Sequence, residues 1–215
     1  MNKTNAMRML DAAGIRYEVL EYEVDESDLS GRHIAEELHF PAERMFKTLV
    51  ARGDKTGPLV FCIPVCAELD LRRAAAQTGN KRVELVPVKE LLGLTGYIRG
   101  GCSPIGMKKK FPTWMDESAL QFDTVTVSSG TRGAQLLLNR AELVDFVQAQ
   151  LLPLTVRSVS YTHLGQTVMR AGQLRAGDLL EIRFADGSVT AVVQNETAGV
   201  QKQEEHENGD EKTEL

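Results

Sequence analysis

The sequence predicts an α+β fold over residues 1–154, and three observations support this. Segments with apolar residues at helical spacing alternate with short runs of β-branched and aromatic residues. Glycine, proline and capping residues mark the ends of these segments. The 215-residue chain is 42% hydrophobic and 26% charged, which is typical of a globular protein with a sizeable core.

The N-terminal elements follow from these rules. Apolar residues at helical spacing between the capping residue Thr4 and Gly14 predict a helix over 5–13. Alternating apolar residues predict a strand over 15–22. The next predicted elements are a short helix from Ser30 to Leu38 and a hairpin of two strands, 45–51 and 59–65.

Helices and strands continue to alternate after the hairpin. The pattern predicts a helix over 69–79, a strand over 81–88 and a helical turn or two over 88–94. Residues 97–112 are rich in glycine and predict a loop with unusual backbone requirements. The last two elements are a strand over 122–130 and a helix over 140–151, which is capped by Asn139 together with Glu142.

Residues after 154 differ in composition. Residues 156–215 hold 6 Lys/Arg and 10 Asp/Glu, whereas the preceding part is nearly neutral. Three short runs predict strands, and Ala-Asp-Gly at 185–187 predicts a hairpin between the last two. We therefore expect a main domain at 1–154, a linker or junction at 155–164, a β-hairpin segment at 165–195 and a disordered acidic tail at 196–215.

Composition excludes several classes of protein. No apolar run approaches the roughly 18 residues that cross a bilayer, and the start lacks the apolar stretch of a signal peptide. Three cysteines without even spacing argue against a disulfide framework. We expect a cytoplasmic protein without a membrane partner. Because the part before residue 156 is nearly neutral, we expect no broad basic surface for DNA or RNA, so any RNA contact must be local.

Common catalytic and metal-binding signatures are absent from the sequence, including the nucleophile elbow, the phosphate-binding loop and H-E-x-x-H. His33 and His39 are six residues apart, which does not place them on one helical face. We therefore expect neither a metal site nor a cofactor. Cys102 lies near Arg99 and Lys108 to Lys110, where a thiolate could be favoured, but its loop holds no histidine to act as a base.

Two glycine-rich corners and one lysine could bind a ligand. The backbone N–H groups of Gly100–Gly106 could form a donor site for a carbonyl, carboxylate or phosphate, or the loop could be a structural turn. The corner at 128–133 supplies two hydroxyls and Arg132, whose guanidinium could hold a terminal adenosine or its phosphate. Lys47 lies in an otherwise apolar strand, so its side chain either extends to the rim or points into a polar cavity.

These elements occur together and in a characteristic order. The segments FKTLV, LDLRRAA, TGYIRGGCSPIGMKKK and VSSGTRG, with the opening KTNAMRMLDAAGIRYEVLEYE, resemble the YbaK/EbsC family of aminoacyl-tRNA deacylases over residues 2–154. The resemblance implies an α+β fold with a curved mixed β-sheet flanked by helices, shared with the editing domain of bacterial prolyl-tRNA synthetases.

The resemblance also implies roles for particular residues. Lys47 matches the functional lysine of the family, and Gly100 and Gly101 begin its glycine-rich loop, so these three are the expected catalytic residues. Cys102 occupies a position at which the family does not require cysteine. The expected substrate-binding residues are Tyr22, Thr48, Ser103, Pro104, Ile105, Gly106, Ser128, Ser129 and Arg132.

A second, shorter resemblance covers residues 165–193, which are similar to the C-terminal β-segment of the large subunit of exonuclease VII. The catalytic core of that enzyme is absent here. Either a natural fusion or a chimera made in assembling or translating the DNA explains this combination. The small size of the segment favours the chimera.

The leading functional hypothesis is a hydrolase that removes cysteine from the proline tRNA by breaking an ester bond. Lys47 would hold or polarise the ester, loop N–H groups would stabilise the carbonyl oxygen, and the thiol of the bound cysteine would attack its own carbonyl. The expected partners are the acceptor end of an aminoacylated tRNA and prolyl-tRNA synthetase. The alternatives are a non-catalytic module that binds aminoacyl-tRNA or a synthetase, and an acyl hydrolase that depends on Cys102.

Overall fold

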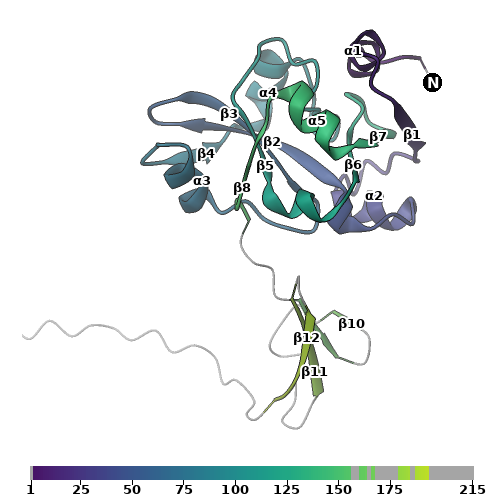
Figure 1. The fold of residues 1–215 in the computed structure, drawn as a ribbon, viewed down its shortest axis with the longest axis vertical. Coiled ribbons are helices and arrows are strands. Elements are labelled where there is room, and N and C mark those ends of the chain that lie inside the picture. The colour runs from purple at the N-terminus through teal and green to yellow at the C-terminus, as the bar shows by residue number, and fades with distance from the viewer. Residues whose placement is uncertain (1, 156–159, 164–165, 168–178, 185–186, 194–215) are drawn as a thin grey trace, which may run out of the picture. The chain divides into compact units, whose positions relative to one another are not determined.

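The computed structural model describes residues 2–155, 160–163, 166–167, 179–184 and 187–193 (Figure 1). Contacts between residues divide the chain into a first unit, Met1–Ser158, and a second unit, Val159–Leu215. Each unit is described by itself.

Eight strands form the centre of the first unit. Five of them form a mixed sheet in the order β4-β2-β3-β5-β8, and three antiparallel strands form a second sheet in the order β1-β7-β6. A parallel bridge between Met45 and Thr126 connects the two sheets. The strands are β1 (Tyr17–Glu21), β2 (Phe46–Gly53), β3 (Gly57–Pro64), β4 (Val83–Leu85), β5 (Thr113–Asp116), β6 (Thr124–Ser128), β7 (Ala134–Asn139) and β8 (Gln150–Leu152).

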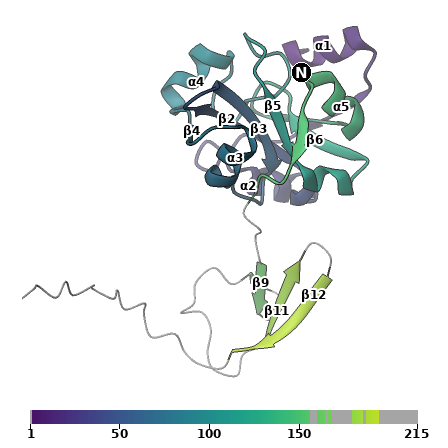
Figure 2. The ribbon, with the colours of Figure 1, turned by 60° about the vertical axis from the view of Figure 1, so that its left-hand side comes forward.

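Helices flank the two connected sheets, which confirms the predicted α+β fold class. In both Figures 1 and 2, α3 and β4 lie at the opposite end of the first unit from α1. Within the described ranges, no helix is long and apolar enough to cross a membrane. The helices are α1 (Asn5–Ala13), α2 (Gly31–Glu37), α3 (Leu71–Gln77), α4 (Val88–Thr95) and α5 (Arg140–Val147), with short 3-10 helices at Ala42–Arg44 and Glu117–Gln121.

Local signals determine the ends of several elements as expected. The side chain of Thr4 accepts a hydrogen bond from the backbone of Met7, and Gly14 ends α1 in the left-handed conformation with φ 70°. Asn139 caps α5 by accepting hydrogen bonds from the N–H groups of Ala141 and Glu142. The predicted hairpin is present, because β2 and β3 pair in antiparallel register.

The predicted helix over 140–151 is wrong at its C-terminal end. Gln148 adopts a left-handed conformation with φ 55° and ends α5, and Gln150–Leu152 form β8, which pairs in parallel with β5. Pairing with a strand distant in the sequence therefore overrides the helical pattern of these residues. The strands β5 and β7 were not predicted either.

The described residues of the second unit form four antiparallel strands in the order β10-β9-β11-β12. The strands β11 and β12 pair in antiparallel orientation, as a hairpin between these two runs requires, although the predicted turn residues 185–186 lie outside the described residues. The predicted acidic tail at 196–215 also lies outside them. The strands are β9 (Ser160–His163), within the predicted junction, β10 (Gln166–Thr167), β11 (Leu179–Phe184) and β12 (Gly187–Val192).

A buried carboxylate holds the end of the first unit. Asp116 is 3% exposed, and its Oδ2 accepts hydrogen bonds from the backbone N–H groups of Leu154 at 2.9 Å and Thr155 at 3.1 Å. Arg73 donates to the carbonyl of Thr155 at 3.3 Å. Among the described residues, the contacts of this unit therefore include Thr155, one residue beyond the predicted end at 154.

This anchor predicts where the chain can be shortened. A chain that ends at Ser158 should keep the melting temperature of the first unit, whereas a chain that ends at Leu154 should melt several degrees lower. The shorter chain loses the contacts of Thr155 and places a new α-carboxylate beside the buried Asp116. We expect a loss of about 1–3 kcal/mol. Calorimetry of both truncations tests this, and equal melting temperatures would contradict it.

Candidate active site

The two glycine-rich corners lie against each other. Nε of Arg132 donates a hydrogen bond to the carbonyl of Arg99 at 3.0 Å. A Cβ atom on Gly101 would lie 3.1 Å from the backbone of Thr131, which is closer than side chains normally approach. Gly100 adopts φ 85°, a conformation that favours glycine. Glycine at both positions therefore lets the two loops pack together.

Tyr97 organises the loop that contains these glycines. Its hydroxyl donates a hydrogen bond to the carbonyl of Ile105, and its ring would contact a Cβ atom on Gly130 at 2.9 Å. The N–H of Ile105 donates to Oγ of Ser103 at 3.3 Å, and both residues are buried. Pro104 lies half-buried between them. This loop is therefore held by its own hydrogen bonds.

Two successive N–H groups of the loop, on the buried residues Cys102 and Ser103, lack a hydrogen-bond acceptor among the described residues. The N–H of Gly101 donates to the carbonyl of Ile98 at 3.1 Å, so it already has an acceptor. The N–H groups of Cys102 and Ser103 have no acceptor in the part of the chain that the structure describes. Adjacent backbone donors of this kind can bind a carbonyl oxygen or an anion.

Lys47 and Thr48 point to opposite faces of β2, as neighbours in a strand must. Oγ1 of Thr48 lies 4.0 Å from the buried thiol of Cys62. Nζ of Lys47 donates a hydrogen bond to the carbonyl of Val65 at 3.2 Å, on the face covered by α2. The structure therefore does not bring these two predicted site residues together.

The environment of Lys47 disfavours its charge. Burial lowers the pKa of Lys47, while negative charge on Cys66 and Glu68 would act in the opposite direction and Arg32 lowers the pKa further. An ammonium group has three donors, and among the described residues only the carbonyl of Val65 accepts one. Lys47 can therefore donate to an oxygen atom of a ligand.

Buried oxygen atoms without partners share a face with Lys47. The bridge between Met45 and Thr126 puts Thr126 and Ser128 on the same face as Met45 and Lys47. Gln135 pairs with Ser128 on this face. Oγ1 of Thr126 and Oε1 of Gln135 are buried and lack a hydrogen-bond partner within the described residues.

Unpartnered buried polar atoms are rare, so they mark this face as one that a polar ligand could complete. Sequence reasoning did not select Thr126 or Gln135. The alternation of polar and apolar residues in β6 was the available signal for Thr126.

Tyr22 connects this face with the glycine corners. Its N–H donates to the carbonyl of Gly133 at 3.0 Å, and its side chain packs with the cluster of Met45 and Val65 under α2.

Arg132 also forms an ion pair at 3.4 Å with the exposed Glu26. The predicted residues thus form two neighbouring groups. Across the described ranges, no hydrogen bond or ion pair joins Lys47 directly to residues 100–106.

The remaining predicted hydroxyls have different surroundings. Oγ of Ser128 accepts a hydrogen bond from the N–H of Gly130 at 3.3 Å. Ser129 is fully buried, its Oγ has no partner in the described part, and its carbonyl accepts a hydrogen bond from Thr4. Gly106 ends the loop, and its carbonyl accepts a hydrogen bond from Asn5 at 3.2 Å.

The buried cysteines are poorly suited to act as nucleophiles. Burial raises the pKa of Cys62 and that of Cys102 to about 12, so both thiols are protonated at neutral pH. This argues against an acyl hydrolase that depends on Cys102. Among the described residues, no group of three His, Cys, Asp or Glu side chains could hold a metal ion.

Comparisons with a family model, with a curated relative and with a solved structure all lead to proteins of aminoacyl-tRNA editing. The model of the aminoacyl-tRNA editing domain matches residues 30–146. The chain is 46% identical over 155 residues to an Enterococcus faecalis protein that bears the name Cys-tRNA(Pro)/Cys-tRNA(Cys) deacylase EbsC, covering 72% of this chain and 94% of that protein. A solved structure described as a trans-editing enzyme for prolyl-tRNA synthetase is similar in fold, with a TM-score of 0.60 and 24% identity over 70% of this chain and 92% of that one.

Two glycine substitutions, one at the contact between the corners and one in α4, should have opposite effects on stability. Gly101→Ala should destabilise the protein by about 1–3 kcal/mol, because its Cβ would press on the backbone of Thr131. Gly93→Ala should stabilise it by up to about 1 kcal/mol, since Gly93 lies in α4 with open space around it. Urea unfolding of both variants tests this. Equal stability of Gly101→Ala and the wild type would show that the loops do not pack this closely.

Proposed function

The chain belongs to the family of aminoacyl-tRNA editing domains, and we propose that it deacylates mischarged tRNA, with Cys-tRNA(Pro) as its main substrate. The observation that carries the proposal is Lys47, a half-buried cation with unused donors at the position of the functional lysine of the family. The name of the 46% identical relative supports the choice of substrate.

We assign the two groups of site residues complementary roles. Lys47 holds or polarises the ester that links the amino acid to the tRNA. The N–H groups of Cys102 and Ser103 stabilise the negative charge that develops on the carbonyl oxygen. Gly100 and Gly101 shape this donor site by letting the loop pack on Thr131.

The attacking group comes from the substrate. The thiol sulfur of the bound cysteine attacks its own carbonyl carbon, the ester C–O bond breaks, and the 3′ oxygen of the tRNA leaves with a proton. Water then opens the resulting thiolactone to free cysteine. This route accounts for a site in which sequence and structure offer no convincing general base.

The rest of the site would hold the acceptor end of the tRNA. Arg132 uses only part of its five donors on Arg99 and Glu26, so its guanidinium can still bind the terminal nucleotide. Ser128 and Ser129 belong to this corner, and Tyr22 contacts it through the carbonyl of Gly133. We propose that prolyl-tRNA synthetase presents the substrate, as the description of the structural relative supports.

We further propose that the activity resides in the first unit. The matched family region at 30–146 lies within it. We assign the second unit no role in the reaction, and its origin as a chimera stays a prediction.

Deacylation assays with the purified protein test the proposed function. Release of amino acid from Cys-tRNA(Pro), Ala-tRNA(Pro) and Pro-tRNA(Pro) is measured with and without prolyl-tRNA synthetase. We expect the fastest release from Cys-tRNA(Pro). Binding of the charged tRNA without release of amino acid would instead identify a non-catalytic module.

Lys47→Met should nearly abolish deacylation, with a loss of roughly 100 to 1,000-fold in rate. The melting temperature should stay equal or rise, because burial lowers the pKa of Lys47 and the charged form is disfavoured in the folded state. For the same reason, wild-type stability should rise with pH between this lowered pKa and 10.5, and the variant should lack this rise. The matched control is Lys55→Met, at an exposed turn. Activity within a few-fold of wild type would remove Lys47 from the mechanism.

Cys102→Ala should retain deacylation within a few-fold and lower stability modestly. Its thiol is protonated at neutral pH and packs in a cluster with Val50 and Tyr97, so it contributes to packing. Rates on Cys-tRNA(Pro) and thermal melting measure the two effects. A loss of more than 100-fold in a folded variant would restore the hypothesis of a Cys102 nucleophile.

A further inference from the structure

A long stretch around the glycine loop carries positive charge and no negative charge. Residues 91–115 contain no Asp or Glu, although the whole chain holds 30 acidic residues and has a net charge of −5. The same stretch holds Arg99 and the run Lys108, Lys109 and Lys110. The adjoining corner at 128–133 adds Arg132 and no acidic residue. The two glycine-rich segments are therefore basic in an acidic protein, and the acidic residue paired with them is Glu26, which contacts Arg132.

The three lysines are exposed, and hydrogen bonds hold the backbone of Lys108 and the side chains of Lys108 and Lys110. The N–H of Lys108 donates to the carbonyl of Thr95 at 2.9 Å, and its Nζ donates to the carbonyl of Leu92 at 3.3 Å at the end of α4. Nζ of Lys110 donates to Gln148 at 2.6 Å. In the described part of the chain, none of the three forms an ion pair. Their charges are available to an external anion.

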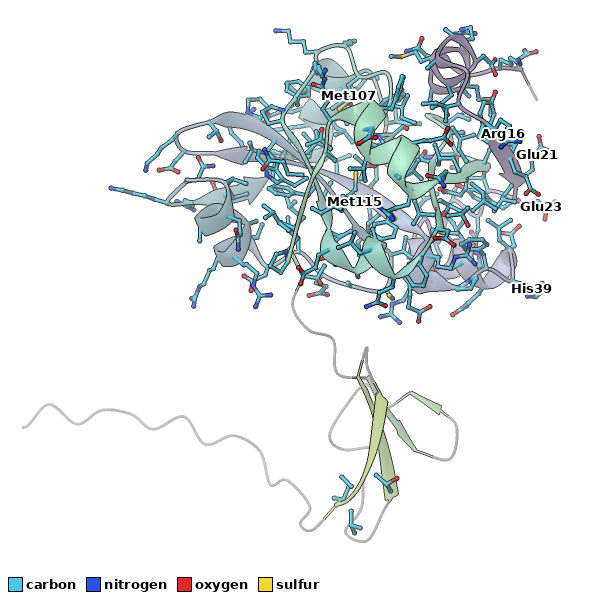
Figure 3. The ribbon with its side chains drawn as sticks, in the orientation of Figure 1. Arg16, Glu21, Glu23, His39, Met107 and Met115 are labelled. Atoms are coloured by element: carbon cyan, nitrogen blue, oxygen red, sulfur yellow. The ribbon has the colours of Figure 1, made fainter. Side chains whose placement is uncertain are left out.

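These lysines directly follow the loop assigned to the substrate. Lys108 comes two residues after Gly106, so their Cα atoms are at most about 7 Å apart. Figure 3 shows Met107, between them, at the upper part of the first unit, well away from the acidic Glu21 and Glu23 at its side. A polyanion whose end lies in the loop can therefore reach the lysines without approaching those carboxylates.

We propose that Lys108, Lys109 and Lys110 form a docking surface for the phosphates of the tRNA acceptor stem. This inference rests on the proposed function, because it places the stem next to the ester bond in the site. Charge complementarity favours RNA as the partner. Lysine ammonium groups bind phosphates as point charges without reading the sequence, so this surface contributes affinity and orientation and does not select the tRNA.

The test compares two substrates that differ only in the stem. One is full-length Cys-tRNA(Pro), and the other is 3′-cysteinyl adenosine, which carries the same ester without a stem. The variant is Lys109→Gln with Lys110→Gln, which leaves the Lys108 contact to α4 intact. The matched control is Lys55→Gln with Lys81→Gln, which removes the same charge from exposed positions elsewhere.

We expect the variant to lose roughly 10-fold in kcat/KM on the tRNA at low salt and nothing on the adenosine ester, while the control changes neither. The slope of log kcat/KM against log salt concentration should become shallower by about 1 to 2 for the tRNA.

Four results would overturn the inference. Unchanged tRNA kinetics, with the ester still hydrolysed, refute the docking surface and leave the proposed function standing. Equal losses on both substrates show that the lysines affect the site or the fold. A loss seen only when prolyl-tRNA synthetase is present assigns the surface to a protein partner. If the wild type hydrolyses neither substrate, the proposed function fails and the inference falls with it.

Discussion

The parallel bridge between Met45 and Thr126 is the constraint on which the candidate site depends. It connects a five-stranded mixed sheet with a three-stranded antiparallel sheet, so that β2 and β6 become neighbours. Since alternate residues of a strand share a face, this single register places Lys47 on the same side as Thr126, Ser128 and Gln135. A shift by one residue would turn the lysine toward the apolar cluster beneath α1. The chemistry of the site is thus determined by how two sheets meet.

This arrangement lowers the stability of the fold, so a purely structural role does not account for it. Lys47 is half-buried with one carbonyl as its acceptor, and two buried side-chain oxygens on the same face have no partner in the described residues. Apolar residues at these positions would avoid desolvation of polar groups. A site that awaits a polar ligand accounts for all of them together, because the ligand would supply the missing hydrogen bonds. The glycine corners are stabilised partly by hydrogen bonds of their own, from Tyr97 to the carbonyl of Ile105 and from Gly101 to the carbonyl of Ile98.

Much of the fold could be predicted from the sequence because its signals are local. Thr4, Gly14 and Asn139 mark helix ends, and the β2–β3 hairpin joins strands that are close in the chain. The strand β8 was missed because its partner β5 lies more than 30 residues away, and its residues also suit a helix. For the site, the motif order identified Lys47 and the glycine loop. The motif order did not show that Thr48 points away from Lys47, toward Cys62. It also did not show that the N–H of Gly101 donates to the carbonyl of Ile98. Both facts depend on three-dimensional contacts.

The anchor at Asp116 also has a mechanical meaning. Its buried carboxylate accepts hydrogen bonds from the N–H groups of Leu154 and Thr155, and Arg73 donates to the carbonyl of Thr155. Tension applied to the chain beyond Thr155 would load these hydrogen bonds before it reached β8 or the strands behind it. The face that carries Lys47 would then not be distorted by forces on the residues that follow Thr155. Extensions of different length and origin could follow this point without disturbing the geometry around Lys47.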